Sequence, residues 1–249
     1  MRFIENPQQI LQSYGAVSLF LDFDGTLTDI AATPESVSVN EHTKILLQQL
    51  YSKKMFSLAI VTGRPIDEVD NFLYPLLLPI AGKHGAEIRN GPKIVKMNIP
   101  VKLDRIVKKF ESFSNNHPWT FIENKGSNIA FHYRNSDLTD NEVQAWAKQN
   151  ISLKNKFKCI FGKKVCEVIP IQINKGLAIK YFMELEQFKN GFPIFIGDDA
   201  TDEDGFKFIN QVGGLSIKVG ESGRSEAKSY LRDVDETRLW ISNLLKCIG

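Results

Sequence analysis

The chain carries Leu21-Asp22-Phe23-Asp24-Gly25-Thr26-Leu27-Thr28 directly after an apolar run over residues 16–21. This run is short and rich in Val, Leu and Phe, which is typical of a buried strand. Two carboxylates, one residue apart, follow where the strand ends. In an open parallel α/β sheet, ligands bind outside the carboxyl ends of the strands. Because an unpaired buried charge is costly, the pattern indicates that a cation or a reaction occupies this place.

The spacing of Asp22 and Asp24 suits nucleophilic and acid–base chemistry. Alternate residues of an extended backbone share a face, so both carboxylates point the same way. One can attack an electrophile while the other moves protons, and Gly25 permits a tight turn. The residues alone also allow a plain Asp-Gly turn that closes a strand.

The composition is that of an ordinary folded protein. The 249 residues suit one large domain or a domain with a sizeable insert. No apolar run approaches the roughly 20 residues that span a bilayer, and the first residues lack the apolar core of a signal peptide. We therefore expect a cytoplasmic enzyme with no membrane partner, and a monomer is the simplest oligomeric state for it.

The cysteines and the charge distribution bear on which metals, disulfides and partners are expected. Cys159, Cys166 and Cys247 form no C-x-x-C pair, so zinc and a disulfide framework are not expected. Residues 101–170 hold 12 Lys and Arg against 7 Asp and Glu, whereas the rest of the chain holds 19 against 22. The basic part suits an anion, although a solvated surface explains it equally well. No basic stripe has interleaved aromatic residues, so no nucleic-acid partner is expected.

Apolar strands alternate with amphipathic helices along most of the chain. Strands are expected over 16–21, 56–61, 78–81, 192–196 and 215–219, and helices over 40–53, 66–72, 175–187, 202–209 and 235–245. This order predicts βαβ units and hence an α/β, Rossmann-like core with a parallel sheet. Asn90-Gly91 predicts a hairpin turn.

The pattern changes near Pro100. Helices are expected over 101–113 and 139–149, the second with Thr139 as N-cap, and each is followed by a hairpin, over 119–134 and 156–168. We predict an α+β domain with the order α-β-β-α-β-β, over residues 100–172. It is inserted into a core made of residues 1–99 and 173–249.

Three expected strands end in reactive groups, namely Asp22 with Asp24, Thr62, and Asp198 with Asp199. If these strands are parallel, the groups share one edge of a sheet. Carboxylates without a matching set of His or Cys favour a hard cation, most simply Mg²⁺.

Two neighbouring features support this edge. Acids at the start of a helix are stabilised by its dipole, which explains Asp202 but not the density of acidic residues over 198–204. Lys175 opens a helix against the same dipole, which indicates a negative charge nearby. A solvent-exposed lysine remains the alternative.

The ordered motifs D-F-D-G-T-L-T, T-G-R, N-K-G and G-D-D-A-T-D-E-D resemble those of the haloacid dehalogenase (HAD) superfamily of phosphohydrolases. More narrowly, segments 82–89, 123–134 and 166–170 resemble the trehalose-6-phosphate phosphatase family, whose cap matches the insert. The resemblance implies a HAD-like fold and a magnesium-dependent hydrolase of trehalose biosynthesis. Its substrate would be trehalose 6-phosphate, a disaccharide phosphate, and an aspartate would be phosphorylated transiently.

The resemblance also assigns roles by position. Asp22 becomes the nucleophile and Asp24 the acid and base, while Thr62 and Lys175 hold phosphoryl oxygens. The metal ligands become Asp22, the backbone carbonyl of Asp24, and Asp198. Asp199 lies in or near the next layer, and Asp202 orders the loop or binds Lys175.

Sugar recognition is assigned to cap and core residues: Glu123, Lys125, Arg134, Glu167, Arg64 and His84, with Arg89 a further candidate. From the residues alone, the charged cap positions favour cross-strand ion pairs on a solvent-facing sheet, and His132 is interpreted as packing. A phosphatase for sucrose phosphate or mannosyl-glycerate phosphate is the alternative enzyme. A catalytically silent regulatory domain is the other alternative, although the complete catalytic set opposes it.

Overall fold

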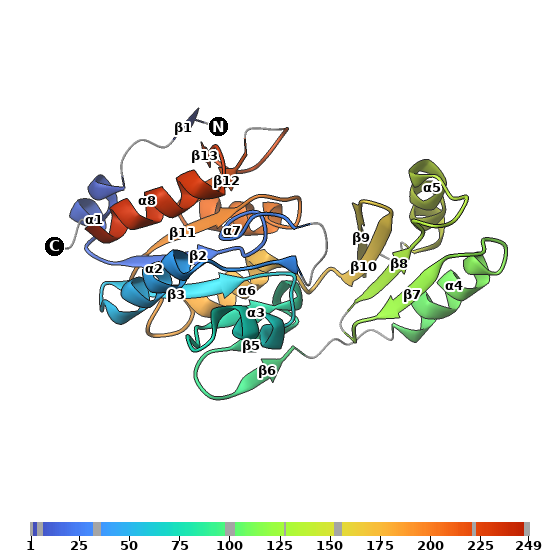
Figure 1. The fold of residues 1–249 in the computed structure, drawn as a ribbon, viewed down its shortest axis with the longest axis horizontal. Coiled ribbons are helices and arrows are strands. Elements are labelled where there is room, and N and C mark those ends of the chain that lie inside the picture. The colour runs from blue at the N-terminus through green and yellow to red at the C-terminus, as the bar shows by residue number, and fades with distance from the viewer. Residues whose placement is uncertain are drawn as a thin grey trace. The chain divides into compact units, whose positions relative to one another are not determined.

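The computed structural model describes residues 2–3, 7–31, 36–97, 103–126, 128–151, 156–220 and 223–246. The chain divides into two compact units (Figure 1). Met1–Met97 and Asn174–Gly249 form one, which we call the core unit, and Asn98–Ile173 form the other, the cap unit.

The core unit is built on a nine-stranded sheet with the order β1-β13-β12-β11-β2-β3-β4-β5-β6. Its strands are β1 (Arg2–Phe3), β2 (Val17–Leu21), β3 (Phe56–Val61), β4 (Ile80–Gly82), β5 (Glu87–Arg89), β6 (Ile94–Lys96), β11 (Phe192–Gly197), β12 (Leu215–Val219) and β13 (Ser229–Leu231). All pairs from β1 to β4 in this order are parallel, and β5 and β6 are antiparallel. The predicted parallel sheet and the hairpin at Asn90-Gly91 are confirmed.

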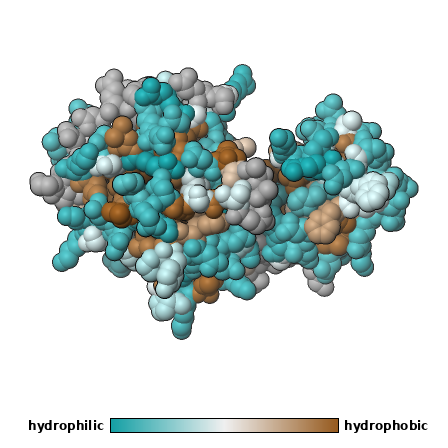
Figure 2. All heavy atoms as spheres, in the orientation of Figure 1, coloured by the Kyte–Doolittle hydropathy of each residue, from teal (hydrophilic) through white to brown (hydrophobic). Residues whose placement is uncertain are grey.

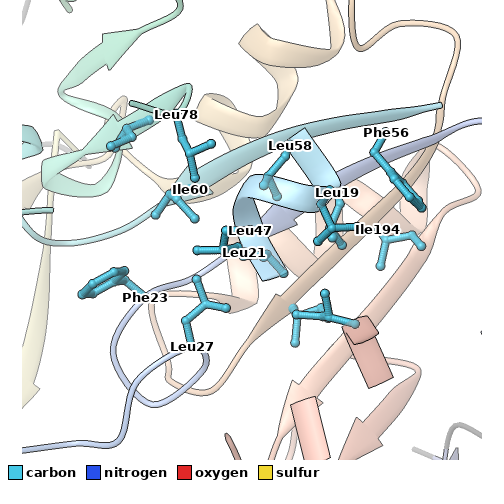
Figure 3. Packing of buried hydrophobic residues seen from close by; sticks show 14 of the residues in the cluster. Leu19, Leu21, Phe23, Leu27, Leu47, Phe56, Leu58, Ile60, Leu78 and Ile194 are labelled. Atoms are coloured by element: carbon cyan, nitrogen blue, oxygen red, sulfur yellow. The ribbon is translucent and has the colours of Figure 1, made fainter. Parts of the chain in front are cut away.

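Helices cover both faces of the central strands. They are α1 (Gln8–Tyr14), α2 (Glu41–Ser52), α3 (Ile66–Leu73), α6 (Lys175–Met183), α7 (Glu203–Gln211) and α8 (Val234–Lys246). Side chains of α2, α3 and α8 pack on one face around Leu19, Leu58 and Ile194 (Figure 3). Side chains of α6 and α7 pack on the other around Phe20 and Phe195. Because successive residues of a strand point to opposite faces and both faces are covered, these strands are mostly apolar along their whole length.

The sequence pattern did not predict α1, β1 or β13. It also extended the helix of α6 to residue 187, whereas the helix ends at Met183. Beyond that point Phe188 is fully buried and stacks on Phe20 at 5.5 Å between ring centroids. The chain leaves the helix axis after Met183, and the Phe188 ring is buried there. The periodic pattern of apolar residues does not show this change of direction.

The cap unit has the predicted order. Its elements are α4 (Asp104–Ser114), β7 (Phe121–Asn124), β8 (Ile129–His132), α5 (Asp140–Asn150), β9 (Phe157–Gly162) and β10 (Val165–Pro170), and the antiparallel sheet has the order β7-β8-β10-β9. Both helices pack on one face of this sheet. Thr139 caps α5 in a capping box with Glu142, as predicted.

Residues 101 and 102 of the predicted first cap helix, and Cys247, lie outside the described residues. Cys166 is buried, Cys159 is half-buried, and both are free thiols. Hydrophilic residues cover most of the face shown in Figure 2. Within the described ranges, every helix is too short or too polar to cross a membrane.

Candidate active site

Three neighbouring strands of the core unit bring the polar groups together. β2 lies between β3 and β11 and runs parallel to both. Asp22 follows β2, Thr62 follows β3 and Asp198 follows β11, so all three stand at the same edge of the sheet. The backbone N–H of Asp22 donates to the carbonyl of Ile196 at 2.9 Å, which extends the ladder to the first catalytic candidate.

Lys175 connects the acidic groups. Its Nζ donates to Oδ1 of Asp22 and to Oδ1 of Asp202, each at 2.7 Å. The lysine is 2% exposed and opens α6, where Asn174 accepts the N–H of Leu177 as N-cap. A cation at this end opposes the helix dipole, and the two carboxylates are what stabilises it there. The alternative of a solvent-exposed lysine is wrong.

Asp202 organises the loop after β11. Its Oδ2 accepts the backbone N–H groups of Asp198 and Asp199, both at 3.0 Å. Gly197 is required beside it, because a Cβ there would lie 2.3 Å from Cγ of Asp202. The carboxylate of Asp202 therefore serves the loop and Lys175 together. Asp199 turns its Oδ1 to the N–H and hydroxyl of Thr201, at 2.7 and 2.6 Å.

The acidic residues fit a divalent cation. One oxygen from each of Asp22, Asp198 and Asp202 lies within 4.8 Å of the others. Oδ1 of Asp198 is buried and has no hydrogen-bond partner among the described residues. Gly25, at φ +76°, leaves room for this carboxylate, since a Cβ would lie 2.2 Å from it. A donor set of carboxylate oxygens alone suits Mg²⁺ rather than a softer metal.

Burial shifts the acid–base balance of this cluster. It is the largest cause that raises the pKa of Asp22 to about 8; Asp198 adds to the rise and Lys175 opposes it. Burial, with Asp202 and Asp199, raises the pKa of Asp198 to about 6. Burial and the charge of Asp22 raise the pKa of Asp202 well above its usual range. Burial alone would lower the pKa of Lys175, but Asp202 and Asp22 outweigh it and raise that pKa. The ammonium of Lys175 thus stays charged, but its single positive charge does not balance the carboxylates around it.

Asp24 faces a different partner from Asp22. Arg64 donates to both of its oxygens, from Nε at 2.6 Å and from Nη2 at 2.8 Å. The same guanidinium reaches Glu68 at 3.1 Å and lies over the ring of Phe72. The sequence interpretation assigned Arg64 to substrate binding, whereas here its fork is occupied by the second catalytic candidate.

Thr62 and His84 lie beside this pair. Oγ1 of Thr62 is buried and accepts the N–H of Arg64 at 3.1 Å. His84, at φ +59°, donates its backbone N–H to the carbonyl of Thr62 at 2.9 Å. Arg89 lies apart from these contacts, because it pairs with Asp70 at 2.5 and 2.7 Å and with the carbonyl of Leu78.

In the cap unit, a row of charged and ionisable side chains lies on the open face of the sheet, opposite the two helices. Lys125 Nζ lies 2.7 Å from Glu167 and 3.9 Å from Glu123, and His132 Nε2 lies 3.1 Å from Glu123. Arg134 is exposed in the turn after β8 and takes no part in these ion pairs. The cross-strand ion pairs expected from the residues alone are therefore present.

The polar contacts of two residues, His132 and Lys218, were not identified from the sequence. His132 was interpreted as packing, but its side chain lies on the open face beside Glu123 and Phe121; the alternation of residues 129–132 was the available signal. Lys218, on β12, is 7% exposed and donates to the backbone carbonyl of Asp198 at 2.6 Å. A lysine between Ile217 and Val219, in a strand expected to be buried, was the signal for this residue.

Comparisons with known proteins agree with this geometry. A family model described as Trehalose-phosphatase matches residues 20–236. The trehalose-6-phosphate phosphatase of Escherichia coli is 33% identical over 231 residues, which cover 89% of this chain and 84% of that protein. A probable trehalose-phosphate phosphatase of Sinorhizobium fredii is 36% identical over 207 residues, covering 82% and 77%.

A solved structure shows the same fold. The C-terminal domain of C. albicans trehalose-6-phosphate phosphatase matches with a TM-score of 0.84 at 21% identity, covering 99% of this chain and 98% of that one. The predicted fold, a parallel-sheet α/β core with an inserted α+β unit, is thereby confirmed.

Proposed function

Because the chain belongs to the trehalose-phosphatase family, whose relatives are named as phosphatases, we propose that it hydrolyses trehalose 6-phosphate to trehalose and phosphate. We further propose that the reaction needs Mg²⁺ and passes through a phosphorylated Asp22. The observation that supports this most is the meeting of Asp22, Asp198 and Lys175 at one sheet edge, with Asp24 two residues beyond the nucleophile.

The first half-reaction transfers the phosphoryl group to the protein. An oxygen of Asp22 attacks phosphorus, and the bond between phosphorus and the sugar oxygen breaks. Asp24, as a carboxylic acid, gives its proton to that sugar oxygen. Lys175 holds Asp22 in place by its 2.7 Å hydrogen bond and, with Thr62, would bind phosphoryl oxygens as charge moves onto them.

In the second half-reaction a water molecule attacks the phosphorus of the aspartyl-phosphate. Asp24 takes the proton of this water, the bond to Asp22 breaks, and phosphate leaves. The fork of Arg64 pairs with the carboxylate form of Asp24, which is the form that accepts a proton. Proton donation in the first half-reaction therefore requires this fork to open.

The cofactor would be held by Asp22, by the backbone carbonyl of Asp24 and by Asp198. It would supply positive charge that lets a carboxylate approach a phosphate dianion. Asp199 and Asp202 would support these ligands through the loop contacts described above.

Sugar recognition would fall to the cap, over residues 100–172. The hydroxyls of a disaccharide bind to carboxylates and cations of fixed geometry. Glu123, Lys125 and Glu167 form such a set on the open face of the cap sheet, with Arg134 as a further ligand, and Arg64 and His84 would contribute from the core unit.

The test is phosphate release from a panel of sugar phosphates, with Mg²⁺ and with a chelator. We expect trehalose 6-phosphate to be hydrolysed far faster than glucose 6-phosphate, and only with the cation. A preference for sucrose phosphate or mannosyl-glycerate phosphate would assign the alternative enzyme. No release from any sugar phosphate would favour a silent regulatory domain.

A further inference from the structure

Lys218 is a buried lysine that the reaction as described does not use. It lies on β12, where it pairs in register with Gly197 of the neighbouring strand β11. Lysine is almost never buried unless it is paired. Within the described part of the chain, no carboxylate forms an ion pair with Lys218; its Nζ instead donates to the backbone carbonyl of Asp198 at 2.6 Å.

The hydrogen bond from Lys218 holds the backbone carbonyl of Asp198, the residue whose carboxylate has an oxygen without a hydrogen-bond partner among the described residues. Asp202 accepts the N–H of Asp198 and of Asp199 at 3.0 Å. The peptide group before the Cα of Asp198 is thus held by a carboxylate, and the peptide group after it is held by that carboxylate at its N–H and by the Lys218 ammonium at its carbonyl. Together they set the direction of the Cα–Cβ bond of Asp198, whose Oδ1 is left without a hydrogen-bond partner among the described residues.

The charges point the same way. Four carboxylates, those of Asp22, Asp198, Asp199 and Asp202, surround the ends of β2 and β11, and two buried ammonium groups accompany them: Lys175 and Lys218. Without Lys218 the cluster would lose one of these two positive charges, and the carbonyl of Asp198 would lose its donor.

We propose that Lys218 is a positioning residue of the cation site: its ammonium holds the carbonyl of Asp198 and thereby aims the Asp198 carboxylate at a divalent cation. It touches neither the substrate nor the cation. The proposal rests on the cofactor part of the proposed function and does not depend on which sugar phosphate is hydrolysed.

The test is Mg²⁺ binding to the whole protein without substrate, measured by titration calorimetry and by the shift of the melting temperature with Mg²⁺. Residues that orient metal ligands typically change metal affinity by about 10- to 100-fold when mutated. We expect Lys218→Met to fold, to weaken Mg²⁺ binding within that range, and to raise the Mg²⁺ concentration for half-maximal activity equally. The KM for the sugar phosphate at saturating Mg²⁺ should not change. Lys218→Arg, which keeps the charge and the donor, should restore most of the affinity.

Lys228→Met is the matched control, since its side chain is exposed on the loop before β13, and it should bind Mg²⁺ like the wild type. Lys218→Gln provides a second neutral variant. A Mg²⁺ affinity within twofold of wild type in either folded neutral variant would overturn the proposal. So would failure of both to fold, because Lys218 would then serve stability alone. A wild type that binds Mg²⁺ but hydrolyses no sugar phosphate would end the proposed function and leave this test intact.

Discussion

Replacing Lys175 by Met removes the one cation that joins Asp22 to Asp202. Its ammonium lies 2.7 Å from both carboxylates, and all three side chains are almost fully buried. Removing one partner of a buried ion pair typically costs about 3–5 kcal/mol, because the other charge stays buried without compensation. The Met side chain fills most of the volume of the lysine stem, so this loss is mainly electrostatic.

The cost of Lys175→Met should depend on pH in a defined direction. The pKa of Asp22 is already raised to about 8, and loss of the lysine raises it further. A carboxyl whose folded-state pKa is raised stabilises the fold at low pH and loses that stabilisation as pH rises through the folded pKa. Each pH unit over which one extra proton stays bound is worth about 1.4 kcal/mol. Below about pH 8 Asp22 keeps its proton in both folded proteins, so the deficit should be nearly constant from pH 5 to pH 7 and change above pH 8, where only the wild type releases that proton.

Urea unfolding of both proteins in the presence of a chelator measures this deficit across the pH range. Lys180→Met, at an exposed position of the same helix, is the control and should change stability by no more than about 0.5 kcal/mol. A deficit for Lys175→Met below about 1 kcal/mol, equal at pH 7 and pH 9, would refute the assignment of Lys175 as the central counter-ion.

Three further predictions concern the backbone turn, the cap and the cation. Gly25→Ala places a Cβ 2.2 Å from the Asp198 carboxylate at a positive φ; displacing that group should lower phosphate release about 100-fold, and unchanged kinetics would contradict the packing. Glu167→Ala removes the partner of Lys125 and should raise KM for trehalose 6-phosphate by about 10- to 100-fold while leaving an aryl phosphate unaffected; equal losses on both substrates would exclude Glu167 from sugar recognition. Mg²⁺ must displace protons from Asp22 and Asp198, whose pKa values are raised to about 8 and 6, so its affinity should increase from pH 6 to pH 8 with release of protons in calorimetry; a constant affinity over this range would show that neither carboxyl is a ligand.

The strand ends could be predicted from the sequence because local patterns determine them. Apolar runs followed by polar residues placed Asp22, Thr62 and Asp198 at the ends of parallel strands, and the strand order makes those ends neighbours. The alternating pattern likewise predicted the α-β-β-α-β-β order of the cap unit. In each case the information lies within one element.

The pairings between elements could not be predicted in this way. Arg64 binds Asp24, 40 residues away. Lys175 binds Asp202, 27 residues away, a contact that was expected from the family resemblance and not from the sequence pattern. Each contact depends on how a loop and a helix pack on the sheet, which leaves no periodic trace in the sequence. The same holds for Lys218, since β12 becomes the neighbour of β11 only in the folded sheet.

The most direct test of the central claim is to trap the covalent intermediate. Enzyme with Mg²⁺ is mixed with trehalose 6-phosphate labelled on phosphorus, quenched in acid within one turnover, and the protein-bound label is treated with hydroxylamine. If the sheet edge around Lys175 activates Asp22 as the nucleophile, wild type retains label that hydroxylamine removes, as for an acyl phosphate, and Asp22→Asn folds normally but retains none. Full turnover without bound label, or equal labelling of Asp22→Asn, would contradict the mechanism.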